Sequence, residues 1–140
     1  MKIRKIKDLL GTDRDVNGIG FKSVRVLLEK DGMGFSLHKT YIPKGDEHFW
    51  HYKNHQEACY CVSGKGMIKN MKTEETFLIE KDTTYILDQN DPHTFQSFED
   101  VVLISVFNPP IKGREVHRSD GSYGSSFEDV NGVKSLNKKQ

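Results

Sequence analysis

Residues 45–64 read GDEHFWHYKNHQEACYCVSG, a stretch that sets several possible metal ligands between two glycines. On a β-strand, residues two positions apart point to the same face. If the whole stretch is extended, one face collects a set of ionisable and sulfur-containing side chains. This set is His51, Lys53, His55, Glu57, Cys59 and Cys61. The pattern predicts a strand with one chemically active face.

The spacing in this stretch resembles the first motif of the cupin superfamily, which runs from glycine through His-x-His and glutamate to a second glycine. Gly45, His51, Glu57 and Gly64 fall in register, although Lys53 replaces the second histidine. Residues 81–93, KDTTYILDQNDPH, are similar to the second cupin motif and end on its metal-binding histidine, here His93. The resemblance implies an all-β, cupin-type double-stranded β-helix, a jelly-roll barrel.

Short runs of alternating polar and apolar residues support an all-β fold. They lie at residues 21–29, 34–42, 55–63, 66–71, 76–80, 83–88, 93–98 and 101–107. Evenly spaced short strands separated by turn residues are typical of sandwiches and barrels. Residues 3–10, IRKIKDLL, are compatible with an edge strand or a short helix.

Length and composition indicate one domain. The 140 residues are predicted to form a single domain over residues 1–124, followed by a flexible polar tail over residues 125–140. The net charge of +1 favours neither nucleic acid nor an anionic membrane as a partner. Without an apolar signal or membrane-spanning segment, a cytoplasmic location is expected, with Cys59 and Cys61 reduced and buried in the core or at an interface.

Three longer strings resemble ectoine synthases: HYKNHQEACYCVSGKG (51–66), YILDQNDPH (85–93) and GREVHRSDGSY (113–123). This resemblance extends from the first residues to about Tyr123. It implies iron(II) held by Glu57, Tyr85 and His93, and Zn(II) or Mn(II) are possible substitutes because all three metals accept oxygen and nitrogen ligands.

The same resemblance implies the other site residues. Substrate contacts are expected at Phe21, Arg25, Thr40, Ser105 and Phe107, and catalytic roles at Tyr85, Glu115 and His117. Arg25 is predicted to clamp a carboxylate, and Glu115 and His117 to carry protons. Phe21 stands where the family typically has tryptophan, and Ser105 where it typically has cysteine, so Ser105 provides no thiolate.

The implied reaction is the metal-dependent cyclisation of N-γ-acetyl-L-2,4-diaminobutyrate, an amino-acid-derived small molecule, to ectoine, a compatible solute used against osmotic stress. One alternative is a cupin dioxygenase or isomerase in which His51 or His55 joins Glu57 and His93. Another is a non-catalytic cupin that binds a small solute. Exposed sheet edges favour a homodimer. The histidines at 38, 48, 51 and 55, taken singly, are expected to be packed or surface residues.

Overall fold

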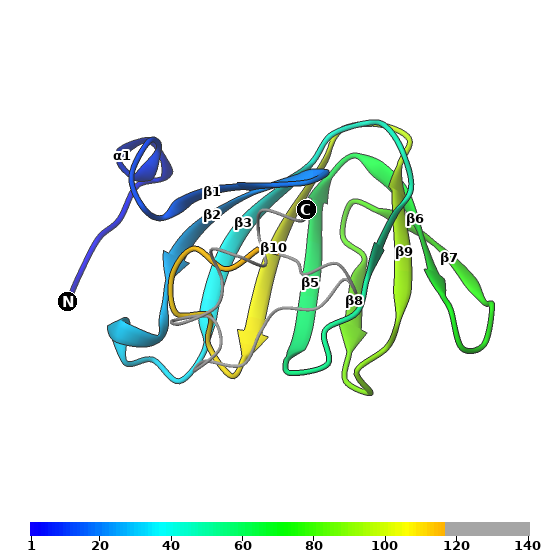
Figure 1. Ribbon diagram of the computed structural model, residues 1–140. Coiled ribbons are helices and arrows are strands. Elements are labelled where there is room, and N and C mark those ends of the chain that lie inside the picture. Colours follow the sequence, from blue (N-terminus) through cyan, green and yellow to red (C-terminus); the bar gives the residue numbers. More distant parts are fainter. Residues whose placement is uncertain (117–140) are drawn as a thin grey trace.

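A six-stranded antiparallel sheet forms the larger wall of the molecule (Figure 1). The computed structural model describes residues 1–116. The strands follow the order β1-β2-β3-β10-β5-β8, so the two central strands come from distant parts of the chain. Their bounds are β1 (Asp15–Gly18), β2 (Phe21–Leu27), β3 (Ser36–Ile42), β10 (Val101–Asn108), β5 (Gln56–Ser63) and β8 (Thr84–Leu87).

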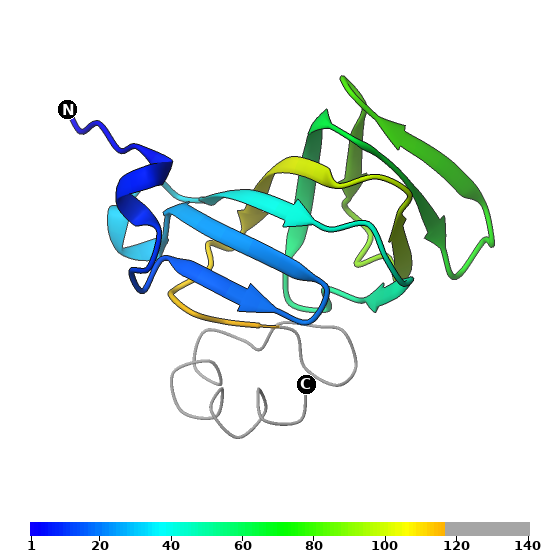
Figure 2. The ribbon, with the colours of Figure 1, turned by 90° about the horizontal axis from the view of Figure 1, so that it is seen from above.

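A four-stranded antiparallel sheet lies against the larger one, in the order β4-β9-β6-β7. Its strands are β4 (His48–Trp50), β9 (His93–Ser97), β6 (Lys65–Asn70) and β7 (Thr76–Glu80). Figures 1 and 2 show the two sheets curving around a shared interior, with α1 and β7 at opposite ends of the molecule. Two antiparallel sheets around one interior are the predicted all-β barrel.

Helical structure is limited to two short elements. The stretch whose sequence allowed a strand or a helix forms α1 (Ile6–Leu9), and a 3-10 turn, η1 (Glu29–Asp31), follows β2. The strand predicted over residues 21–29 therefore ends two residues early, at Leu27. None of the helices in residues 1–116 reaches the length and hydrophobicity that a bilayer span requires.

Strand alternation decides which side chains enter the core. On β10, Val101, Leu103, Ser105 and Phe107 are buried, and the residues between them are more exposed. On β5, the odd positions Glu57, Cys59 and Cys61 are buried, as predicted. Both cysteines are free thiols, and their expected place in the core is confirmed.

The same prediction is wrong for the residues before β5. β4 ends at Trp50 and β5 begins only at Gln56, so residues 51–55 form a connection rather than a strand. The alternation of buried and exposed side chains changes phase in this connection. At its start the even-numbered residues Trp50 and Tyr52 are buried, whereas on β5 the odd-numbered residues are buried. Lys53, by contrast, is exposed. A face counted continuously from His51 to Cys61 does not exist.

Candidate active site

Strand register aligns five inward residues across the larger sheet. Arg25 on β2 is paired with His38 on β3, and His38 with Ser105 on β10. Ser105 is paired in turn with Cys59 on β5, and Cys59 with Tyr85 on β8. Residues far apart in the sequence, from 25 to 105, are thereby brought into one row facing the interior.

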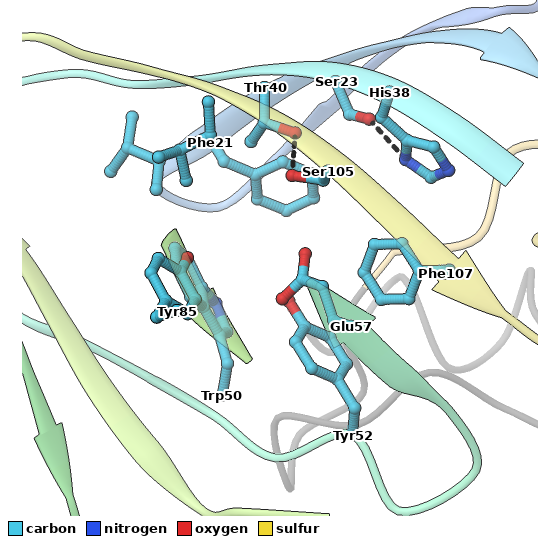
Figure 3. Close-up of a pocket in the computed structure, with 12 residues that line it drawn as sticks. Phe21, Ser23, His38, Thr40, Trp50, Tyr52, Glu57, Tyr85, Ser105 and Phe107 are labelled. Carbon is cyan, nitrogen blue, oxygen red and sulfur yellow. Dashed lines mark hydrogen bonds between the residues drawn. The ribbon is translucent and has the colours of Figure 1, made fainter. Parts of the chain in front are cut away.

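Next to this row lies a small cavity, part of it open to solvent (Figure 3). It is lined by Phe21, Ser23, His38, Thr40, Ile42, Trp50, Tyr52, Glu57, Tyr85, Leu103, Ser105 and Phe107. The structure thus brings together six residues that the family resemblance implied for the site. These are Phe21, Thr40, Glu57, Tyr85, Ser105 and Phe107.

Aromatic rings form much of the cavity wall. Trp50 meets Phe21 edge-on with ring centroids 6.1 Å apart, and Tyr52 meets Phe107 edge-on at 5.2 Å. Sequence reasoning missed Trp50 and Tyr52 as site residues because it counted the alternation from His51. Counting from Trp50 would have placed both on the inner side.

Ser23 and His38 also line the cavity without having been predicted to belong to the site. His38 is buried, with Nδ1 3.1 Å from the Ser23 hydroxyl and Nε2 2.9 Å from the Ser36 hydroxyl. Burial, and after it the nearby Arg25 charge, holds the pKa of His38 well below its ordinary value. His38 is therefore a neutral, fully hydrogen-bonded ring, consistent with the packed role that its sequence position suggested.

Three hydroxyl and thiol groups meet beside the cavity. Thr40 Oγ1 lies 3.1 Å from Ser105 Oγ, and Cys59 Sγ lies 3.4 Å from the same oxygen. All three side chains point toward the interior, close to Glu57. A thiol is therefore present next to Ser105, but on the neighbouring strand.

Glu57 presents a buried carboxyl group to the cavity. Burial raises the pKa of Glu57 to about 7, and hydrogen bonding from Cys59 and Ser105 acts in the opposite direction. Burial, and then the neighbouring Cys59 and Glu57, raises the pKa of the Tyr85 phenol well above its ordinary value. A cation bound beside them would favour the ionised forms of both oxygen groups.

His93 is buried on β9 and has one unpartnered ring nitrogen. Its Nδ1 lies 2.9 Å from the Asp91 carbonyl oxygen, whereas Nε2 has no hydrogen-bond partner. Burial lowers the pKa of His93 to about 4, so the ring is neutral at physiological pH. His93 lines a second cavity, and Tyr85 lines both this cavity and the one next to Glu57.

These three groups fit a divalent cation. A carboxylate, a phenolate and a neutral imidazole form a mixed oxygen and nitrogen ligand set that suits Fe(II), Mn(II) or Zn(II). Within residues 1–116, no three His, Cys, Asp or Glu side chains lie close enough to hold a metal ion without help from another residue type. The alternative triad that adds His51 or His55 to Glu57 and His93 is therefore not assembled in this part of the chain.

Arg25 and Glu115 lie beside the cavity rather than in its lining. The fully buried Arg25 guanidinium donates hydrogen bonds to the backbone carbonyls of Gly113 (2.8 Å) and Glu115. The Glu115 carboxylate accepts hydrogen bonds of 2.6 Å from the backbone N–H groups of Lys112 and Gly113. Both residues hold the segment after β10 against the barrel. The predicted proton carrier His117 lies outside the described residues.

The predicted tail over residues 125–140 and the end of the predicted domain at residue 124 also lie outside the described residues. Glu29, in η1, lies 3.4 Å from the Lys112 ammonium group.

Comparison with known proteins identifies the relatives of the chain. Residues 1–126 match the profile of a family described as ectoine synthase. The L-ectoine synthase of Desulfosudis oleivorans is 50% identical over 124 residues, which cover 88% of this chain and 96% of that protein. The family match includes every described residue that was predicted for the site.

Solved structures agree in fold. The crystal structure of ectoine synthase from P. lautus matches with a TM-score of 0.77 and 38% identity, covering 80% of each chain. The cupin domain of Schizosaccharomyces pombe Cnp3 has a TM-score of 0.53 at 20% identity, covering 62% of this chain and 63% of that one, and is similar in fold alone. The predicted cupin-type barrel is confirmed.

Proposed function

Because the chain belongs to the ectoine synthase family, we propose that this enzyme closes N-γ-acetyl-L-2,4-diaminobutyrate into ectoine. The free α-amine attacks the acetamide carbonyl carbon, and a carbon–nitrogen double bond replaces the carbonyl. The amine gives up two protons, and these leave with the carbonyl oxygen as one molecule of water. The family membership is the observation on which this proposal depends, since it covers residues 1–126.

We propose Fe(II) as the cofactor, with Mn(II) or Zn(II) as possible substitutes, held by Glu57, Tyr85 and His93. When bound, the cation supplies a Lewis acid for the amide carbonyl, which is a poor electrophile on its own. Support comes from the unpartnered Nε2 of His93 and from Tyr85, which lines the cavities on both sides.

The cavity walls supply orientation and exclude water. Phe21, Trp50 and Phe107 provide apolar surfaces against which the methylene chain of the substrate can fold. Thr40 and Ser105 offer hydroxyl groups that can hydrogen-bond its polar ends. Holding amine and carbonyl within reach in a restricted space lowers the entropic cost of ring closure.

Glu115 and His117 are proposed as proton carriers. In the structure, the Glu115 carboxylate accepts hydrogen bonds from two backbone N–H groups, which fix its position beside the cavity. General acid–base catalysis commonly contributes about 10²- to 10⁴-fold. Glu115→Gln is therefore expected to lower kcat by about that factor without loss of the fold.

The decisive experiment incubates the iron-loaded protein anaerobically with N-γ-acetyl-L-2,4-diaminobutyrate and measures ectoine by mass spectrometry. Tyr85→Phe is expected to lose both iron and product, because it removes one ligand oxygen and leaves the ring in place. A folded protein that binds iron but forms no ectoine would overturn the proposed reaction. Retention of iron by Tyr85→Phe would overturn the proposed ligand set.

We further propose that the protein acts in the cytoplasm as a homodimer and contributes a compatible solute during osmotic stress. Exposed apolar residues on β7 and β8 support self-association, namely Phe77, Leu78 and Ile86. Sedimentation of the purified protein at a mass near 16 kDa would contradict the dimer, since one chain has a mass of 16.1 kDa.

A further inference from the structure

Ser105 is held from two sides by groups on the neighbouring strands. Thr40 on β3 approaches its hydroxyl oxygen to 3.1 Å, and the Cys59 thiol on β5 approaches it to 3.4 Å. Glu57 lies two residues before Cys59 on the same face of β5. Figure 3 shows the Thr40–Ser105 pair directed toward the Glu57 carboxyl group from the opposite side of the cavity.

The number of hydrogens on these groups limits how they can be arranged. A serine hydroxyl has one hydrogen to donate and two lone pairs to accept with. The Cys59 thiol also has one hydrogen, and both Cys59 and Ser105 are hydrogen-bonding neighbours of Glu57. If Thr40 and Cys59 both donate to Ser105, the Ser105 hydrogen remains for Glu57. Cys59 and Ser105 are 0% and 1% exposed, so bulk water does not replace a missing partner. Removal of the thiol would leave the Ser105 hydroxyl held by Thr40 but not by β5, so its orientation toward Glu57 would be less fixed.

We infer that Cys59 is a positioning residue of the active site, whose thiol fixes the Ser105 hydroxyl and, through it, the Glu57 carboxyl group. This inference rests on the proposed function, in which Glu57 binds the cation and Ser105 contacts the substrate. The family resemblance implied a cysteine at position 105. In this chain the thiol lies on Cys59, the register partner of residue 105 across the strand pair.

Cys61 provides a matched control. It lies two residues after Cys59 on the same face of β5 and is equally buried. Its thiol, however, is directed to the backbone carbonyl of Ser63 at 3.3 Å. Cys59→Val and Cys61→Val therefore remove the same group from the same strand, and only the first removes a contact with Ser105.

The test measures the Fe(II) dissociation constant by anaerobic calorimetry, together with KM, kcat and the unfolding temperature of the metal-free protein. Groups that orient metal ligands commonly change metal affinity or activity by about 10- to 100-fold. Cys59→Val is expected to weaken Fe(II) binding by that factor and to lower kcat. Cys61→Val is expected to leave both unchanged. Cys59→Ser retains a donor and is expected to recover most of the loss.

Equal Fe(II) affinity in Cys59→Val and the parent protein would overturn the inference. So would equal losses in Cys59→Val and Cys61→Val, which would indicate general core damage. If Cys59→Val fails to fold, Cys59→Ser/Ser105→Cys decides: the exchanged pair should bind iron as tightly as the parent, and weaker binding refutes the pairing. Failure of the parent protein to bind iron would instead refute the proposed function.

Discussion

His93 Nδ1 lies 2.9 Å from the backbone carbonyl oxygen of Asp91, and this contact determines which ring nitrogen is available. A carbonyl oxygen can only accept, so Nδ1 carries the hydrogen of the neutral ring. Nε2 is left as a lone-pair donor, buried and without a hydrogen-bond partner. Histidines that bind metals are commonly oriented through their other ring nitrogen in this way. The fold thus leaves Nε2 available to the cation proposed for this site.

His93→Gln should abolish tight Fe(II) binding while the metal-free barrel stays folded. The substitution removes the imidazole ligand but keeps a polar side chain of similar length. We expect affinity to fall by more than about 100-fold, beyond the effect of a residue that only orients a ligand. His51→Gln is the control, because His51 contacts the backbone carbonyl of Asn90 at 2.8 Å. A larger loss in His51→Gln, measured by calorimetry, would favour a different ligand set.

Glu57 should make the stability of the metal-free protein depend on pH. Folding raises the pKa of Glu57 from 4.5 to about 7. The folded state therefore retains a proton that the unfolded chain releases between these values, and this group lowers the free energy of unfolding as pH rises from about 4.5 to 7. Glu57→Gln should remove this contribution, which urea titrations at several pH values would measure.

The comparison with Glu57→Gln is needed because three buried histidines act in the opposite direction. Burial lowers the pKa of His55 and of His93 to about 4 and holds the pKa of His38 well below its ordinary value. The unfolded chain binds protons to these rings between pH 4 and 6.5, so their contribution to stability increases with pH. Only the difference between parent and Glu57→Gln isolates the carboxyl group. A difference that does not vary between pH 4.5 and 7 would contradict a raised pKa.

The strands were predictable because alternation is a local property of the sequence. β5 and β10 bury every second residue, and their inward positions follow directly from the pattern. Residues 51–55 were misjudged for the same reason, since nothing local marks the point where a strand stops and the count restarts. The partners of β10 were not predictable, because β3 and β5 come from distant parts of the chain.

The cavity was predictable only where the family resemblance named its residues. His38 and Ser23 show the limit, because each looks like an ordinary strand residue until the pairing of β2 with β3 places the His38 ring beside the Ser23 hydroxyl. Arg25 shows another limit. Its charge suggested a carboxylate partner, but the fold directs it to the backbone carbonyls of Gly113 and Glu115, about ninety residues further along the chain.

Arg25→Lys should loosen the segment after β10 even when no substrate is present. Lysine cannot donate to the carbonyls of Gly113 and Glu115 with the fixed geometry of a guanidinium group. Amide hydrogen exchange in residues 111–116 is expected to accelerate. Lys112→Ala is the control, because it removes only a partly exposed ion pair with Glu29. Unchanged exchange in Arg25→Lys would instead favour a role confined to the substrate carboxylate.

Asp31 should be a main contributor to the attachment of the N-terminal segment. Its carboxylate lies 2.8 Å from Arg4 and 3.0 Å from Arg14, and it accepts a hydrogen bond from the Leu28 N–H. Asp31→Asn removes the negative charge that two arginines share, although both keep hydrogen bonds to backbone carbonyls. The free energy of unfolding should therefore fall by about 1.5–3 kcal/mol, the range for hydrogen bonds to charged groups. The exposed Asp13 gives a control in Asp13→Asn, for which urea titration should detect almost no change.

The effect of Asp31→Asn should also depend on pH. Hydrogen bonding from Arg4, followed by the Leu28 N–H and Arg14, holds the pKa of Asp31 well below its ordinary value of 3.8. The stabilisation is therefore complete above about pH 4 and is lost as pH falls below that value. The difference between parent and variant should shrink in acid. A difference that grows in acid would contradict the ion pair as its cause.

Gly20→Ala should disturb the cavity through two aromatic rings. Gly20 turns the β1–β2 hairpin at φ +79°, and a Cβ atom there would overlap the His48 ring. His48 is stacked on Trp50 with centroids 5.7 Å apart, and Trp50 lines the cavity. Gly32 also has a positive φ, +73°, but has open space around it. Gly32→Ala should therefore lower the free energy of unfolding only through backbone strain at a positive φ, by about 1–2 kcal/mol.

Gly20→Ala should lower the free energy of unfolding by about 1–3 kcal/mol more than Gly32→Ala does, because extra atoms are forced into a packed site. Trp50 is the only tryptophan in the chain, so its fluorescence reports on the cavity wall without labelling. The emission should shift in Gly20→Ala and stay unchanged in Gly32→Ala. Equal stability losses with no change in emission would mean that His48 moves aside freely, and that the hairpin turn does not help to hold the Trp50 ring in place.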